Sequence, residues 1–179
     1  MTFPLPLRKA AFVYPIGRPP RTAVLGPWFR NKGILTNDPV RVFPTGWSAE
    51  AAAYAPQAIA ATRQQLLDLA PHAPAITHAL IAIARPGEPW LSPADRDHLW
   101  RAFGVPIFQQ LISETGELLA AECEAHDGLH LTTTELSGYA LDTSPCACGS
   151  AAPRVIPKKP SERARAAAAT DAQIGRAHV

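Results

Sequence analysis

The sequence predicts an α/β domain with a small, partly parallel sheet, a β-rich Cys/His lobe and an extended, proline-rich N-terminal arm. Three observations lead to this prediction. An apolar strand pattern, a capped helix pattern and a second strand pattern follow one another over residues 77–112. Short strand patterns separated by turns fill residues 118–156, where all three cysteines lie. Nineteen prolines, about twice the ordinary usage, are concentrated towards the two ends of the 179-residue chain.

The first 47 residues alternate short apolar runs with proline and glycine, as at 11–15, 22–27 and 40–44. We expect extended segments here, some of them edge strands, because proline removes a donor from the hydrogen-bond ladder of a sheet. Ser48 is a suitable N-cap for a helical turn over residues 49–54. After Pro56, apolar residues recur at helical spacing up to Ala70, which predicts a helix that begins near Ile59.

Residues 77–84 are almost entirely apolar, as in a buried strand. Ser92 with Asp95 forms a capping-box pattern with proline at the first helical position, and Gly104 is a helix C-terminal signal. We expect this helix to turn Leu99, Trp100 and Phe103 inwards. A strand over 105–112 completes a strand–helix–strand unit, which predicts right-handed, parallel pairing. Further strands are expected over 118–123, 129–133, 138–141 and 154–156.

These patterns divide the chain into three parts: an extended basic arm over 1–47, an α/β domain over 48–157 with a Cys/His lobe at 118–156, and a basic, disordered tail over 158–179. Residues 174–179 can be encoded by the bases of a common sequencing adapter. We therefore expect them to be foreign to the natural reading frame, the alternative being an ordinary polar tail.

The net charge of +2 hides an uneven distribution. Residues 1–50 carry seven basic and two acidic groups, residues 154–179 carry six and two, and the middle carries four and eleven. The basic ends can lie on the acidic middle or bind an acidic protein partner. Basic and aromatic residues interleave too little to predict nucleic-acid binding. With no membrane-length apolar run, no secretory pattern and an odd number of cysteines, we expect a cytoplasmic protein with reduced thiols and no membrane contact.

The cysteines and nearby histidines form the pattern that carries the most chemistry. Cys123 and His126 are spaced C-x2-H, while Cys146 and Cys148 form a C-x-C pair followed by glycine. Thiolates and imidazoles from two turns can close a tetrahedral zinc shell. We expect structural zinc on these four residues, with His130 as an alternative ligand or as a hydrogen-bond partner of a ligand.

Two other interpretations of the cluster stay open: free thiols and surface histidines that merely share a β-rich region, and a redox or catalytic thiol. The acidic residues Glu114, Glu117, Glu122 and Glu124 are expected to form a solvated rim rather than an acid/base pair. The sequence contains neither a G-x-G-x-x-G motif nor a phosphate loop. No catalytic or cofactor-binding residue is therefore assigned.

Two further segments connect these patterns to a known family. The sequence Gly87-Glu-Pro89 with Phe103-Gly-Val-Pro-Ile-Phe108, and then the run 119–131 around Glu122-Cys123, resembles phenylacetate-type coenzyme A ligases over roughly residues 56–156. Those are adenylate-forming enzymes, and the resemblance places this part at the end of their large N-terminal domain. It also implies zinc, because some of these ligases hold zinc at the corresponding cysteines and histidine.

The departures from the family determine the expected function. The family has Tyr-Gly-x-Thr-Glu, whose Thr and Glu serve the adenylate and magnesium, where this chain has Leu111-Ile-Ser-Glu-Thr-Gly116. The phosphate loop and the domain with the catalytic lysine have no counterpart. The resemblance therefore implies a non-catalytic, zinc-stabilised binding or regulatory module derived from such a ligase. The alternative is a subunit that completes an AMP-forming acyl- or aryl-CoA ligase site with a partner chain.

Overall fold

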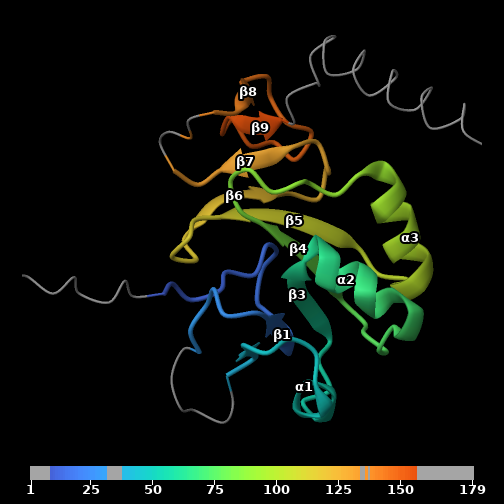
Figure 1. Cartoon of the computed structure of the whole chain (residues 1–179). Helices are drawn as coiled ribbons and strands as arrows, with labels where there is room; N and C mark the ends of the chain where they lie inside the picture. Colours follow the sequence, from blue (N-terminus) through green and yellow to red (C-terminus); the bar gives the residue numbers. More distant parts are fainter. Residues whose placement is uncertain (1–8, 32–37, 134–135, 137, 157–179) are drawn as a thin grey trace, which may run out of the picture.

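The computed structural model describes residues 9–31, 38–133, 136 and 138–156, and they form one nine-stranded mixed sheet in the order β2-β1-β3-β4-β5-β6-β7-β9-β8 (Figure 1). From β2 to β5 neighbouring strands are parallel, and from β5 to β8 they are antiparallel. The strands are β1 (Thr22–Leu25), β2 (Val40–Phe43), β3 (Ala58–Thr62), β4 (Ala79–Ala84), β5 (Ile107–Ile112), β6 (Leu118–Glu122), β7 (Leu129–Leu131), β8 (Ala140–Asp142) and β9 (Arg154–Ile156). The helices are α1 (Ala49–Ala53), α2 (Arg63–Leu69), the 3-10 turn η1 (Ala70–His72) and α3 (Pro93–Phe103). The predicted α/β class with a partly parallel sheet is thus confirmed.

Both faces of the parallel half are covered, so β1, β4 and β5 are buried along their whole length, whereas the edge strand β2 exposes Arg41. Leu25, Ile59 and Leu80 point to the face where the helices pack. Side chains of the opposite parity, such as Val24 and Ile81, pack under the N-terminal segment with Phe12 and Phe29. The near-continuous apolar strands of the sequence follow from this double burial.

The predicted strand–helix–strand unit is present as β4, α3 and β5, with β4 parallel to β5. The Ser92 hydroxyl accepts from the Asp95 backbone N–H at 3.1 Å, while the Asp95 carboxylate accepts from the Ser92 N–H at 2.8 Å. Gly104 ends the helix in the left-handed conformation, with φ of 65°. Leu99 is buried as expected, but Trp100 is 52% exposed. Neighbouring helical residues point about 100° apart, so both cannot face the same core.

The helix expected from Ile59 onwards was wrong in its first turn. Residues Ala58–Thr62 form β3, which lies between β1 and β4, and the helix begins at Arg63. The boundary is fixed by Thr62 and Gln65, whose side chains and backbone N–H groups make a reciprocal capping box. Ile59 fits the helical spacing of Leu66 and Ala70 in the sequence, yet it belongs to the buried strand and not to the helix.

The proline-rich N-terminal region contributes two strands to the sheet. β2 is an edge strand, as expected, whereas β1 lies inside the sheet between β2 and β3. The segment before β1 is fastened to the antiparallel half, because the Ala10 N–H donates to the Thr115 carbonyl at 2.9 Å and the Gln110 side chain donates to the Val13 carbonyl at 2.9 Å. The tail expected over 158–179, including residues 174–179, lies outside the described residues.

Asp95 provides a test of the helix α3 cap and of acid stability. Its carboxylate receives two 2.8 Å hydrogen bonds from Arg63, which with the Ser92 donors hold the pKa of Asp95 well below its ordinary value of 3.8. Asp95→Asn is expected to lower the free energy of unfolding by about 1.5 kcal/mol at pH 7, the low end for a charged hydrogen bond, because Arg63 is partly exposed.

The pH dependence of this effect has a definite sign. A depressed folded-state pKa stabilises the protein above the unfolded-state value and the stabilisation is lost as pH falls. The difference in the free energy of unfolding between wild type and Asp95→Asn should therefore have its largest value above about pH 4 and become smaller below it. Urea unfolding at several pH values measures it. A difference that stays constant down to the lowest pH would contradict the ionic origin.

Candidate metal centre

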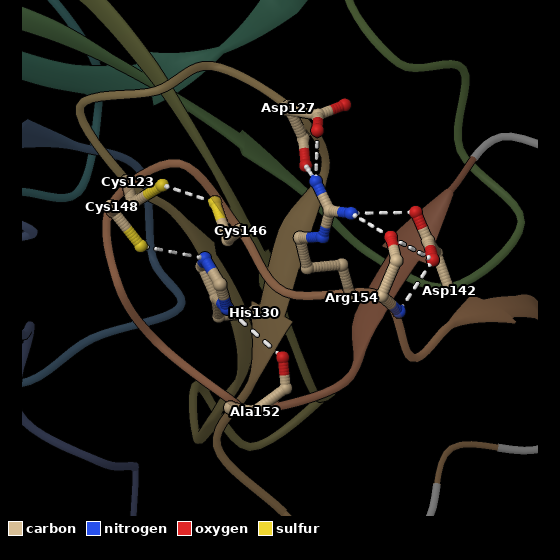
Figure 2. A network of polar contacts seen from close by, with 9 residues as sticks. Cys123, Asp127, His130, Asp142, Cys146, Cys148, Ala152 and Arg154 are labelled. Carbon is tan, nitrogen blue, oxygen red and sulfur yellow. Dashed lines mark hydrogen bonds and ion pairs between the residues drawn. The ribbon is translucent and has the colours of Figure 1, made fainter.

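Three parts of the antiparallel half bring the cysteines and one histidine together. Cys123 follows β6 directly, His130 lies on β7, and Cys146 and Cys148 occupy the turn between β8 and β9. Since β7 lies between β6 and β9, the two cysteine-bearing turns meet beside its middle residue (Figure 2). Strands β6 to β9 and their turns thus hold the Cys/His cluster, and we call this part of the sheet the lobe.

The four ligand atoms are close enough to bind one metal ion. The Cys123 and Cys146 sulfurs are 3.7 Å apart, and Cys148 Sγ is 3.4 Å from His130 Nε2. All four atoms lie within 4.8 Å of one another, and the three cysteines are free thiols. Among the residues that the structure describes, these four form the cluster of His, Cys, Asp or Glu side chains that could hold a metal ion.

The two turns supply backbone donors to the sulfurs. Cys146 begins a tight turn in which the Gly149 N–H donates to its carbonyl at 2.9 Å, and Gly149 has φ of 83°. The Cys148 backbone N–H points at the Cys146 sulfur and is the main reason that the pKa of Cys146 falls to about 6. Burial raises the pKa of Cys123 to about 11, although the Ala125 N–H opposes this. Of these two thiols, Cys146 therefore has the lower pKa and the stronger tendency to become a thiolate.

His130 is oriented by the neighbouring chain. Its Nδ1 lies 3.2 Å from the Ala152 carbonyl, which can only accept a hydrogen bond. Nδ1 must therefore carry the proton, which leaves the lone pair of Nε2 facing Cys148. A backbone carbonyl that fixes the tautomer in this way is usual for metal-binding histidines.

His126 lies elsewhere. The sequence placed it first among the ligands with His130 as the alternative, and the structure brings His130, not His126, to the three sulfurs. The His126 ring stacks on Phe108 with centroids 5.1 Å apart, and its Nδ1 is 3.3 Å from the buried Glu122 carboxylate. The C-x2-H spacing does form a turn, with the His126 N–H donating to the Cys123 carbonyl at 3.1 Å. His126 has φ of 52° in that turn, and its ring packs against Phe108 rather than facing the sulfurs.

Glu122 ties the lobe to the parallel half. It is buried and accepts hydrogen bonds from Arg96 of α3 at 2.9 Å and from the Gln109 backbone N–H of β5 at 2.8 Å. The expected solvated rim of acidic residues is thus wrong for Glu122. Two hollows of about 420 and 470 Å³ flank its partner His126, one beside Tyr14 and Phe108 and the other beside Trp100.

A buried cation supports the turns of the lobe, and the sequence patterns predicted no role for it. Arg154 is 2% exposed and forms ion pairs with Asp127 and, at 2.6 Å, with Asp142, while its guanidinium also donates to Ser144 Oγ at 2.9 Å (Figure 2). The neighbouring Gly128 has φ of 83°, and a Cβ there would lie 3.0 Å from the Val155 carbonyl. Arg154 therefore fastens three segments around the cysteines. The sequence did contain one signal for this role, because Arg154 is a charged residue between apolar neighbours in a predicted strand.

Comparison with solved structures finds a similar fold, whereas comparisons of the sequence find no match. No family model and no curated protein matches the sequence. Among solved structures, the chain is similar to 2-hydroxyisobutyryl-CoA ligase in an open conformation, in complex with 2-HIB-AMP and CoA, with a TM-score of 0.52 and 16% identity. The match covers 77% of this chain and 44% of the ligase chain. The chain thus has the fold of part of an acyl-CoA ligase and spans less than half the length of that enzyme. No helix in the described ranges has the length and apolar character needed to cross a membrane.

Proposed function

We propose that the chain is a non-catalytic binding or regulatory module of ligase origin, stabilised by one structural zinc ion on Cys123, His130, Cys146 and Cys148. The cluster geometry carries this proposal. The kinship proposed is with the phenylacetate-type ligases, because the Glu122-Cys123 segment that resembles them supplies the first ligand. The lobe is then the part that the metal holds together.

The distances suit zinc. With zinc–sulfur bonds of about 2.3 Å, the edge of a tetrahedron between two sulfurs is about 3.8 Å, and the edge between a sulfur and a nitrogen is about 3.5 Å. The corresponding separations here are 3.7 Å and 3.4 Å. Three thiolates and one imidazole are also a common structural zinc set. Four protein ligands leave no position for a water molecule, so the role proposed for the ion is structural.

The carboxyl end of β5 supports a non-catalytic role. In the resembling ligases the Thr and Glu that serve the adenylate and magnesium follow this strand. Here Ser113 Oγ interacts with Thr115 Oγ1 at 2.8 Å and accepts from the Glu117 N–H at 3.0 Å, while Glu114 pairs with Arg85 at 3.4 Å. These polar groups hold the β5–β6 turn, and Leu111 before them is fully buried.

A second candidate is a subunit that completes an acyl- or aryl-CoA ligase site with a partner chain. The observation favouring it is the structural neighbour, whose structure contains an acyl-adenylate and CoA and of which this chain spans 44%. In that case the chain supplies the sheet and a protein partner supplies the phosphate-binding loop and the catalytic lysine.

One preparation tests both candidates. Elemental analysis of the purified chain is expected to give about one zinc per chain, and calorimetric titration with ATP, and separately with an acyl-CoA, is expected to give no binding heat. Zinc together with ATP or acyl-CoA binding would favour the subunit candidate. A chain in which strands β7, β8 and β9 stay folded without metal would contradict the proposed structural zinc.

The two histidines provide a matched pair of variants. His130→Gln is expected to lower zinc affinity at least about tenfold, because a ligand is lost. His126→Gln should leave affinity unchanged, since that ring stacks on Phe108 rather than facing the sulfurs. Competition with a chromogenic chelator measures both. The reverse order of affinities would assign the fourth ligand to His126.

A further inference from the structure

The four proposed ligands differ sharply in their access to solvent. Cys148 is exposed, Cys123 is partly buried and Cys146 is 5% exposed. Oxidation of a cysteine depends on its thiolate character and on its exposure, so among thiolates of one metal shell access decides which sulfur a small oxidant reaches first. The cluster therefore has one sulfur open to solution and two shielded ones close behind it.

We propose that Cys148 is an oxidation site for hydroperoxides, and that its oxidation forms a disulfide with Cys123 and releases the metal. This inference rests on the proposed zinc site and adds a regulation to it. Cys123 is the partner because it belongs to the opposite turn and its sulfur lies within 4.8 Å of the Cys148 sulfur. Cys146 is shielded, with 5% exposure, and belongs to the same turn as Cys148, so a bond to it would not join the two turns.

The chemistry balances with a hydroperoxide as the only oxidant. The Cys148 thiolate attacks the terminal peroxide oxygen, the O–O bond breaks, and the alcohol or water leaves after taking a proton. Cys148 is thereby oxidised by two electrons to a sulfenic acid. The Cys123 thiolate then attacks the Cys148 sulfur, so that an S–S bond forms, the S–O bond breaks and water leaves with a second proton.

The disulfide removes two ligands at once. Cys146 and His130 alone cannot close a tetrahedral shell, so the ion dissociates. The new bond also joins two turns that the metal had held, 25 residues apart in sequence. Peroxide would thus replace a metal cross-link by a covalent one, and a thiol reductant with zinc would reverse the change.

The test uses the zinc-loaded wild-type chain, with metal content measured before peroxide is added. Limiting hydrogen peroxide in the presence of dimedone, followed by peptide mass mapping, is expected to label Cys148. Without dimedone, a Cys123–Cys148 disulfide and close to one zinc released per peroxide consumed are expected. First labelling of Cys123 or Cys146, or a disulfide between any other pair, would overturn the proposal.

A variant supplies the matched control. Cys148→His keeps a nitrogen ligand and removes the accessible thiol, so it should retain zinc and release it at least tenfold more slowly under the same peroxide. Release at the wild-type rate would overturn the proposal. If this variant does not hold zinc, the wild-type labelling decides alone. Absence of zinc from the untreated chain would refute the proposed function instead, so the two failures are distinguishable.

Discussion

Removal of the metal is expected to unfold strands β7, β8 and β9 while the parallel half of the sheet stays folded. The three strands have three residues each, and Leu129 and Val155 are the buried residues that they contribute to their apolar cluster, which they share with Leu111 and Ala120. So small a core contributes little stability, whereas structural zinc supplies apparent binding energies of about 10–16 kcal/mol in zinc-finger peptides. The double variant Cys146→Ser/Cys148→Ser should have the same effect as a chelator.

Hydrogen exchange measured by mass spectrometry resolves the two halves. Amides of 129–156 are expected to lose protection in the double variant, whereas amides of β3, β4 and β5 keep it. Ala147→Ser is the matched control, because it changes an exposed residue between the same two cysteines without removing a ligand. Uniform loss of protection over the whole chain would show that the lobe and the parallel half unfold together. Full protection after zinc removal would refute a structural role for the ion.

The sequence predicted the strand–helix–strand unit well, because its signals are local. Ser92 and Gly104 mark the two ends of α3, and both act through hydrogen bonds and dihedral angles within a few residues. The start of α2 was misjudged because Ile59 lies at helical spacing from Leu66, although it belongs to β3. Only the burial of β3 between β1 and β4 settles the choice, and that depends on residues distant in sequence.

The choice between His126 and His130 shows the same limit at the metal centre. Spacing along the chain favoured His126, which does share a turn with Cys123. The side chain that reaches the sulfurs depends instead on how β7 pairs with its neighbours. His130 stands opposite Arg154 of β9 and Ala121 of β6, and this register places its ring beside the cysteine turn of 146–148. Register between strands cannot be derived from ligand spacing.

The second large effect concerns Arg154 and its two carboxylate partners. Replacing the partners is expected to destabilise the lobe more than replacing Arg154 itself. Its ion pairs hold the pKa of the guanidinium above the ordinary value, with Asp127 as the main cause. Replacing both carboxylates, in Asp127→Asn/Asp142→Asn, leaves a buried charge without a counterion. Arg154→Met removes that charge and leaves carboxylates that solvent can reach, since the Asp127 side chain is 67% exposed and that of Asp142 is 32% exposed.

We therefore expect the double asparagine variant to lower the thermal midpoint of the lobe about twice as much as Arg154→Met, because an uncompensated buried charge costs more than a well-packed apolar replacement. Lobe-specific hydrogen exchange on a temperature series measures the two midpoints. Zinc content should stay at the wild-type level in both variants below the transition, since neither removes a ligand. If Arg154→Met is the more damaging change, the guanidinium acts through its hydrogen bonds to Ser144 and the Asp127 carbonyl rather than through charge balance.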